Sequence, residues 1–399
     1  MANVSSSNGL EKRPKLRFPG FDEPYKQCRI GDIYAERSQR GASDMELLSV
    51  TMNDGVKPRS AIEGKDNSSE DKSNYKIVRK GDMVYNSMRM WQGANGISPC
   101  DGIVSPAYTV LMPKQEINNG YFAALFKSVN LINEFRKNSQ GMTSDTWNLK
   151  YPQIETIKVQ IPSVSEQDKV SELFSVLDER IAAQSQLVES LKKYKRGVMQ
   201  SIFRHSSHED WAIVKLGEIF KKVSRRNSNG DIKNVITNSA EYGLIPQREF
   251  FDKDIAVDGN TSNYYVIEEG DFVYNPRKSN AAPYGPFNRY NLKEKGIISP
   301  LYTCLVLQED INPAYLAWYF KSDAWYRYIY DNGSQGVRHD RVSMTDDLLM
   351  GIPVYLPASS KQSQIAEILN AIENRLSAAQ DEYNTLIKLR DGFTQQLFI

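Results

Sequence analysis

Histidine and cysteine are scarce in this sequence, with three residues of each kind among 399. Two of the histidines, His205 and His208, fall in a polar linker and His339 stands alone. We therefore expect no metal site and no histidine-based catalytic triad. The cysteines are odd in number and far apart in the sequence, which argues against a disulfide framework and favours a reducing cytoplasm. They are Cys28, Cys100 and Cys304.

Long apolar runs are also missing. No stretch approaches the roughly 18 residues that a membrane-spanning helix needs, and residues 1–9 lack the apolar core of a secretory signal peptide. We therefore expect a cytoplasmic protein with no membrane partner, which begins with a disordered polar tail. The composition, 40% hydrophobic and 25% charged, is that of an ordinary globular protein with two or three domains.

A large basic excess is missing as well, since the formal net charge is only +1. Proteins that bind nucleic acids usually carry a basic excess. Two segments are nevertheless basic: residues 215–233 have six Lys and Arg against two acidic residues, and residues 272–295 have five against one. Each segment alone fits a solvated loop with ordinary lysines, but their occurrence in the same half of the chain favours a binding surface there.

What the sequence does have is an internal repeat. The motif Gly-Asp-x-Val-Tyr-Asn occurs at 81–86 and 270–275, and Gly-Ile-Val/Ile-Ser-Pro-x-Tyr occurs at 102–108 and 296–302. A third shared motif is a proline followed five residues later by glutamine, Pro162 with Gln167 and Pro357 with Gln362. The offset grows from 189 to 195 residues, so small insertions separate two copies of one globular unit. A duplicated unit suggests a bipartite target.

Each copy ends in a long helix with a heptad pattern. Apolar residues alternate in steps of four and three over more than four heptads, which predicts a coiled coil rather than a helix resting on a sheet. The first seam is Val170, Phe174, Leu177, Ile181, Gln184, Val188, Leu191, Lys195, Val198 and Ile202. The second seam is Ile365, Leu369, Ile372, Leu376, Ala379, Tyr383, Leu386, Arg390, Phe393 and Leu397. We expect the two helices to pair with each other.

The charges of the two helices predict the direction of pairing. Acidic residues concentrate early in each helix and basic residues late. Antiparallel pairing therefore sets each acidic half beside a basic half and also suits the helix dipoles. Lys195 and Arg390 interrupt both seams at the same phase, either to fix the register or by extending into solvent. Gly197 and Gly392 also coincide, and either the close approach of another chain or fraying near the helix end would explain them.

These patterns predict an α+β fold with two pseudo-symmetric globular domains, separated by two long helices that form an antiparallel coiled coil. Apolar segments at 121–126 and 315–320 are expected to be core helices rather than stacking platforms. Segments 87–101 and 276–295 do not match each other. We therefore expect the two domains to recognise different targets. The expected divisions are a polar tail at 1–20, a first domain at 21–163, a first helix at 164–206, a second domain at 207–358 and a second helix at 359–399.

Together with Ser139-Gln140-Gly141 and Ser334-Gln335-Gly336, these doubled motifs resemble the specificity subunit of type I restriction-modification enzymes, from about Phe18 to Ile399. The resemblance implies that each globular unit is a target-recognition domain for half of a split sequence in double-stranded DNA, and that the helices are spacers. It also implies two modification (methyltransferase) subunits with S-adenosylmethionine and two restriction (motor-nuclease) subunits with ATP and Mg as partners. Lys361 stands where the family pattern has glutamate, which affects only the capping of the second helix.

Motifs for chemistry are absent. The sequence has no Gly-x-Gly turn for a methyl donor and no Gly-x-x-x-x-Gly-Lys-Ser/Thr phosphate loop. The segment Asn275-Pro276-Arg277-Lys278 lacks the second proline and the aromatic residue of an amino-methyltransferase motif. We therefore expect no catalytic residue, no metal and no cofactor in this chain. The alternative function is a non-catalytic coiled-coil scaffold that binds protein partners rather than DNA.

Side chains in the unmatched loops are the candidates for reading bases, because Arg, Lys, Asn, Gln, Ser and Thr recognise base edges. For any one of them, phosphate contact or plain solvent exposure is the alternative. The candidates in the first domain are Asn53, Arg59, Ser87, Arg89, Gln92, Gln140, Thr143 and Ser144, with Trp91 as an apolar contact. Those in the second domain are Arg225, Arg226, Asn238, Arg248, Arg277, Lys278, Asn280, Gln335, Arg338 and Arg341.

Overall fold

The computed structural model of the chain describes residues 13–41, 44–52, 54–144, 146–204, 210–250, 261–333 and 340–399. The chain divides into two compact units. Unit 1 comprises Met1–Gln186 and Gln380–Ile399, and unit 2 comprises Leu187–Ala379. Among the described helices, none is both long enough and apolar enough to cross a membrane.

Unit 1 is built from short antiparallel strands with helices after them. A four-stranded sheet has the order β2-β9-β6-β7, and three ribbons pair β1 with β10, β3 with β4, and β5 with β8. The strands are β1 (Lys26–Arg29), β2 (Tyr34–Glu36), β3 (Leu48–Thr51), β4 (Gly55–Pro58), β5 (Lys76–Val78), β6 (Met83–Asn86), β7 (Asn95–Ile97), β8 (Gly102–Val104), β9 (Tyr108–Pro113) and β10 (Lys158–Ile161). The helical elements are α1 (Ile30–Ile33), η1 (Arg59–Ala61), η2 (Met90–Gln92), α2 (Asn119–Leu125), α3 (Val129–Asn138) and α4 (Tyr151–Ile154).

Unit 2 repeats this topology. Its four-stranded sheet has the order β12-β19-β16-β17, and its ribbons pair β11 with β20, β13 with β14, and β15 with β18. The strands are β11 (Ala212–Lys215), β12 (Phe220–Val223), β13 (Ile236–Ser239), β14 (Gly243–Pro246), β15 (Tyr265–Ile267), β16 (Phe272–Tyr274), β17 (Phe287–Arg289), β18 (Gly296–Ile298), β19 (Thr303–Leu307) and β20 (Pro353–Leu356). The helical elements are α6 (Leu216–Ile219), α7 (Gln247–Phe250), η4 (Thr261–Asn263), α8 (Pro313–Lys321), α9 (Tyr326–Asn332) and α10 (Asp346–Met350). The predicted duplication of one α+β unit is confirmed.

The Gly-Asp motif forms the turn that leads into the central strand of each sheet. Gly81 and Gly270 have φ angles of 90° and 97°, which glycine adopts without the steric cost that a Cβ brings. The carboxylate of Asp82 accepts a hydrogen bond from the backbone N–H of Arg79 at 2.9 Å, and Asp271 does the same for Glu268 at 2.9 Å. Both residues of the motif are therefore fixed by the geometry of the turn.

The shared glutamine joins each domain to the long helix after it. Gln167 accepts a hydrogen bond from the backbone N–H of Asn118 at 3.0 Å and donates to the carbonyl oxygen of Pro162 at 3.0 Å. Gln362 makes the same two bonds, with the N–H of Asn312 at 3.0 Å and the carbonyl of Pro357 at 2.9 Å. Asn118 and Asn312 are the N-cap residues of α2 and α8. A single buried amide thus fixes the start of the long helix against a core helix.

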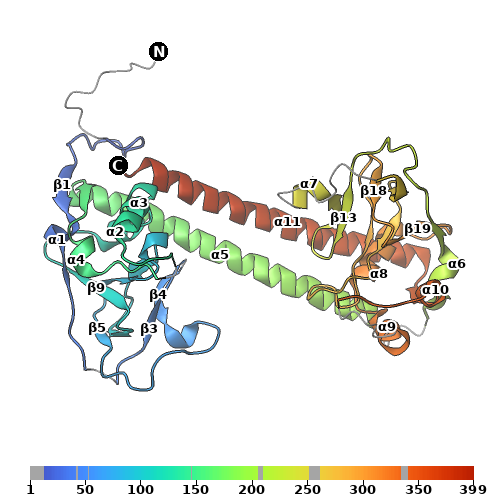
Figure 1. Cartoon of the computed structure of the whole chain (residues 1–399), viewed down its shortest axis with the longest axis horizontal. Coiled ribbons are helices and arrows are strands. Elements are labelled where there is room, and N and C mark those ends of the chain that lie inside the picture. The colour runs from blue at the N-terminus through green and yellow to red at the C-terminus, as the bar shows by residue number, and fades with distance from the viewer. Residues whose placement is uncertain are drawn as a thin grey trace, which may run out of the picture. The chain divides into compact units, whose positions relative to one another are not determined.

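The long helices are α5 (Val164–Phe203), of 40 residues, and α11 (Ser359–Gln396), of 38 residues (Figure 1). None of the predicted seam residues is exposed. In unit 1, Asp178 of α5 pairs with Arg390 of α11 at 2.5 Å and Arg180 pairs with Glu382 at 2.9 Å. In unit 2, Val188 and Leu191 pack with Leu376 and Ala379, and Lys195 pairs with Glu373 at 2.8 Å. Residues later in α5 therefore contact residues earlier in α11, which confirms the antiparallel coiled coil.

The polar residues of the seams form ion pairs across the helices. The Lys195 and Arg390 side chains are only 25% and 17% exposed, and each pairs with an acidic residue of the other helix. Arg390 also lies over the ring of Phe174, 5.9 Å from its centroid. These contacts favour the register-fixing interpretation over extension into solvent, because a slip of one helix past the other would break both ion pairs.

The seam ends complete the cores of the units, which the heptad pattern did not predict. In unit 1, Phe174 of α5 and Leu397 and Phe398 after α11 belong to the same core as Tyr121 and Phe122 of α2. In unit 2, Phe203 at the end of α5 and Ile365 and Leu369 of α11 join Tyr315 and Tyr319 of α8. The aromatic residues of α2 and α8 are core residues, as predicted. Each unit therefore depends on both long helices.

The start of the described chain packs on unit 1. Arg17 donates two hydrogen bonds to the buried carboxylate of Glu166, at 2.9 and 2.8 Å, and Tyr25 donates a third at 3.2 Å. The N–H of Leu16 donates to the carbonyl of Gln396 at 2.9 Å. Residues 13–20 are therefore held against the helix ends, whereas residues 1–9, for which a disordered tail is predicted, lie outside the described residues. Lys361 at the corresponding position of α11 is exposed, so in the described part of unit 2 this departure removes the buried carboxylate of the clasp and not only a capping contact.

Candidate DNA interface

Two loops that are far apart in the sequence meet at the same place in each unit. In unit 1, the backbone N–H of Leu149 donates to the carbonyl of Ser87 at 2.9 Å, and in unit 2 the N–H of Val342 donates to the carbonyl of Pro276 at 2.9 Å. Ser87 and Pro276 each follow the Gly-Asp-x-Val-Tyr-Asn motif directly. We name residues 87–94 with 139–144 and 146–149 the first loop pair, and residues 276–285 with 340–342 the second loop pair. The loops 87–94 and 276–285 fall in the segments of the repeat that do not match each other.

Aromatic side chains brace the first loop pair. Trp91 and Trp147, one from each loop, meet edge to face with ring centroids 5.2 Å apart, and the Arg136 guanidinium lies 5.4 Å from the Trp91 centroid. The backbones of Gln140 and Asn148 exchange two hydrogen bonds of 3.0 and 2.8 Å. This brace was not predicted, because Trp91 had been assigned an apolar contact with DNA. Its indole N–H donates to the carbonyl of Met88 at 3.1 Å.

The first loop pair presents five of the predicted readers at the surface. Arg89, Gln92, Gln140, Thr143 and Ser144 are all exposed. Thr143 Oγ1 lies 3.3 Å from Thr146 Oγ1, whereas the side chains of the other four make no hydrogen bond to a described residue. Such free donors and acceptors are suited to base edges and phosphates. Met142, which is 98% exposed in the same loop, was missed by sequence reasoning because its residue type carries no hydrogen-bonding signal.

The second loop pair carries different side chains from the first. Arg277 and Arg341 face each other across an isolated antiparallel bridge, and the N–H of Lys278 donates to the carbonyl of Asp340 at 2.8 Å. Tyr284 packs on Tyr326 of α9 with centroids 4.9 Å apart, which braces this loop pair in the way that the tryptophans brace the first. The Arg277 side chain is 68% exposed and Arg341 is 33% exposed. Asn280 is exposed and Lys278 is half-buried.

The pKa of Tyr302 is affected by the arginines of the second loop pair. Burial raises the pKa of Tyr302, while Arg277 and Arg341 act in the opposite direction because a cation stabilises the phenolate. Both arginines are therefore close enough to Tyr302 for their charges to be felt there.

Two predicted readers are buried, and the expectation for them is corrected. The Ser87 hydroxyl lies 2.9 Å from Thr109 Oγ1 inside unit 1. The Asn238 amide donates to the carbonyl of Val273 at 2.9 Å and accepts from Asn288 at 2.8 Å inside unit 2. Because both side chains are only 4% exposed and their polar groups are satisfied within the protein, they belong to the framework and not to a DNA surface.

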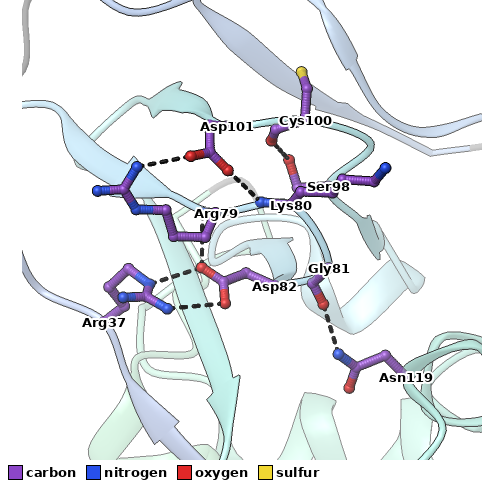
Figure 2. Close-up of polar contacts among 9 residues, drawn as sticks. All are labelled: Arg37, Arg79, Lys80, Gly81, Asp82, Ser98, Cys100, Asp101 and Asn119. Atoms are coloured by element: carbon purple, nitrogen blue, oxygen red, sulfur yellow. Dashed lines mark hydrogen bonds and ion pairs between the residues drawn. The ribbon is translucent and has the colours of Figure 1, made fainter.

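Two arginines that were predicted to contact bases instead bond to groups of the protein. Arg59 donates to the carbonyls of Ile62, Gly64 and Lys65 at 2.6, 3.0 and 2.7 Å. Arg225 pairs with Asp271 of the Gly-Asp turn. The corresponding carboxylate in unit 1, Asp82, is held by Arg37 at 2.7 and 3.1 Å, within a network that also contains Arg79 and Asp101 (Figure 2). Arg225 is thus the counterpart of Arg37 in function, which sequence spacing alone did not reveal.

The other candidates lie away from the loop pairs or outside the described residues. Arg226 donates to the Asn263 side chain at 3.0 Å and bridges to Tyr265, and Arg248 is exposed in α7. Asn53, Gln335 and Arg338 fall outside the described residues. The second Ser-Gln-Gly motif falls there too, directly before the second loop pair.

No site for metal or thiol chemistry stands out within the described part of the chain. No group of three or more His, Cys, Asp or Glu residues there could hold a metal ion. The three cysteines are free. Burial raises the pKa of Cys304 to about 12, so this thiol is protonated near neutral pH and is a poor nucleophile.

The chain is similar to proteins of one kind. Residues 23–193 and 208–387 match the family model of the type I restriction modification DNA specificity domain. The specificity subunit of the type I restriction enzyme MjaVIII of Methanocaldococcus jannaschii is 24% identical over 345 residues, which cover 79% of this chain and 77% of the relative. The putative MjaX specificity subunit of the same organism is 26% identical over 148 residues, 31% of this chain and 34% of the relative.

Two solved structures share the fold. The crystal structure of the type I restriction-modification S subunit from M. genitalium matches with a TM-score of 0.58 and 14% identity, covering 97% of this chain and 99% of that one. A chain from a structure of complex assembly and conformational transition in the type I R-M system matches with a TM-score of 0.56 and 15% identity, covering 95% of this chain and 98% of that one.

Proposed function

This chain belongs to the type I restriction-modification DNA specificity family, and we propose that it reads a bipartite DNA sequence, with one half-site for each globular unit. The proposal rests on the first and second loop pairs. Both occupy the same place on a shared framework, and they carry different side chains. Arg89, Gln92 and Gln140 in unit 1 and Arg277 and Asn280 in unit 2 are the residues that we propose to read the bases.

We further propose that the chain has no chemistry of its own and recruits two modification subunits, and also restriction subunits where the system contains them. S-adenosylmethionine, ATP and Mg would then be bound by these partners. The support is the absence from the sequence of a glycine-rich methyl-donor turn and of a phosphate loop.

The long helices offer a surface for these partners. Five large apolar residues are exposed on α5 and α11, each directly before a seam position: Val176 and Leu389 in unit 1, and Leu187, Tyr194 and Ile368 in unit 2. They therefore share one flank of their helices. In unit 1 the pair of Arg180 with Glu382 joins this flank of α5 to the same flank of α11.

The same flank carries Gly197 of α5 and Gly392 of α11. A Cβ added at Gly197 or at Gly392 would meet no described atom within 4 Å, so a partner helix could approach the backbone closely there. We assign the part of this flank in each unit to the modification subunits, because exposed apolar residues that share one side of a helix mark an interaction surface.

Salt dependence of DNA binding tests the proposed function. Binding of duplex DNA by the complex with its modification subunit should weaken log-linearly with salt as counterions are released. Arg89→Ala and Arg277→Ala should weaken it, whereas Arg327→Ala, an exposed arginine on α9, should not. A complex that assembles but shows no salt-sensitive duplex binding would support the scaffold function instead.

Methyl transfer tests the absence of chemistry. The purified chain with S-adenosylmethionine and DNA should transfer no methyl groups, and activity should appear on addition of the modification subunit. Turnover by the chain alone would contradict the proposal.

Co-purification tests the docking flank. Tyr194→Glu and Leu389→Glu should prevent recovery of the modification subunit with this chain. Lys192→Glu reverses an exposed charge on the other flank of α5 and should leave recovery unchanged. Equal recovery with all three variants would move the docking surface elsewhere.

A further inference from the structure

An acidic residue lies between the two arginines of the second loop pair. The Asp340 carboxylate is 3.9 Å from Nε of Arg277 and also 3.9 Å from Nε of Arg341. Half of the Asp340 side chain is exposed, so the three side chains form a small surface cluster with a net charge of +1. Asp340 was not among the residues selected from the sequence.

The cluster is incompletely satisfied within the protein. Like charges directly opposite each other on paired strands repel, and Arg277 and Arg341 occupy such a bridge. A separation of 3.9 Å is too long for a hydrogen bond, and neither guanidinium donates one to another described residue. In contrast, Arg225 and Arg327 in the same unit form close contacts with carboxylates. No described residue therefore occupies the donors of Arg277, which are available to a ligand, while Arg341 attracts the Asp340 carboxylate through its charge.

The carboxylate indicates what the ligand is. At a DNA phosphate, an exposed aspartate would repel the negative charge that the arginines attract. In the major groove, however, a guanine–cytosine pair presents two acceptors, N7 and O6 of guanine, beside one donor, N4–H of cytosine. An arginine supplies the two matching donors and an aspartate supplies the matching acceptor. The charges of the cluster thus complement a base-pair edge better than a phosphate.

We propose that Arg277 and Asp340 together read a guanine–cytosine pair in the half-site of unit 2, with Arg341 as the positioning residue that orients Asp340. This inference rests on the proposed function. Arg277 is the more exposed of the two arginines and contacts guanine, while Asp340 accepts from the cytosine amino group. Arg341 is the less exposed and holds the carboxylate turned toward the surface.

Methylation mapping of genomic DNA from cells that carry this chain with its modification subunit tests the inference. The unchanged protein should methylate a bipartite sequence whose unit 2 half contains an invariant G·C pair. Arg89→Lys, in the first loop pair, should change only the half-site that unit 1 reads, and it therefore shows which half belongs to unit 2. Asp340→Asn and Arg277→Lys should each lower the discrimination against other base pairs at the same G·C position, by about tenfold to a hundredfold. Discrimination at the other positions should stay unchanged. Arg327→Lys should change nothing.

Arg341→Lys should weaken discrimination at the same position as Asp340→Asn, and the two changes together should cost no more than the larger one alone, because Arg341 acts through Asp340. A purely structural role would instead lower methylation at all sites alike. Arg277→Lys keeps the charge but loses the planar fork, so it separates base reading from general attraction.

Three results would overturn the inference. One is a sequence-specific target whose unit 2 half has no invariant G·C pair, which leaves the proposed function standing. Another is an Asp340→Asn variant that strengthens binding to all duplexes equally, which would place the cluster at a phosphate. The third is Arg277→Lys methylation with unchanged discrimination. A complex with no sequence preference at all would instead refute the proposed function.

Discussion

Replacing Asp82 by alanine should destabilise unit 1 without changing the DNA sequence that is read. Asp82 is 6% exposed and accepts two hydrogen bonds from Arg37 and one from the N–H of Arg79. Removing one partner of a buried ion pair costs about 3–5 kcal/mol. Because Arg37 is 22% exposed and can regain some hydration, we expect about 2–4 kcal/mol here.

Calorimetry of the purified complex measures this effect. For a domain of roughly 200 residues, a loss of ~3 kcal/mol lowers the unfolding temperature by about 6–12 °C. Asp101→Ala is the matched control, since Asp101 belongs to the same network (Figure 2) but pairs with Arg79 where both side chains are 48% exposed. It should lower the unfolding temperature by much less than Asp82→Ala, because an exposed ion pair contributes little to stability. Equal losses from the two substitutions would show that burial does not set the strength of these pairs.

Three further outcomes follow from the framework. Arg225→Ala should lower the stability of unit 2, because it leaves the Asp271 carboxylate without its cation, and methylation mapping should show all base positions unchanged. Gln362→Ala should destabilise unit 2 by about 1–3 kcal/mol in thermal unfolding, since it leaves the N–H of Asn312 and the carbonyl of Pro357 unpaired. Deleting residues 181–187 and 376–382 removes one heptad from each helix between the Asp178–Arg390 and Lys195–Glu373 ion pairs. It also removes Glu382, the partner of Arg180, and shortens each helix by ~10 Å, or about three base pairs of DNA. Methylation mapping of this deletion should show unchanged half-sites and a shorter gap; an unchanged gap would mean that the helices do not set the spacing.

The sequence predicted the architecture well because the repeat and the heptads are redundant signals. Each motif occurs twice, so an accidental match in one copy is checked by the other. The seam residues recur over many turns, and the charge gradient gave the antiparallel direction that Asp178–Arg390 and Lys195–Glu373 confirm. Core aromatics such as Tyr121 and Tyr315 could be predicted from the apolar helices in which they lie.

The candidate site was harder to predict, because residue type does not reveal how a side chain is used. Arg225 and Arg277 look alike in sequence, yet Arg225 holds a buried carboxylate while Arg277 is 68% exposed. Ser87 and Asn238 lie at the ends of motifs or strands but point inward. The two loops of each pair are joined by a backbone hydrogen bond, which depends on tertiary folding and leaves no local signature.

Exchange of one unit tests the central claim most directly. Residues 207–358 would be replaced by the matching unit of a relative with a different target, so that α5 and α11 keep their seam and ion pairs. Methylation mapping with the original modification subunit should then show one half-site replaced, the other half-site unchanged and the gap of the same length. A change in both halves, or methylation of the original sequence, would contradict independent reading of the two half-sites by the two units.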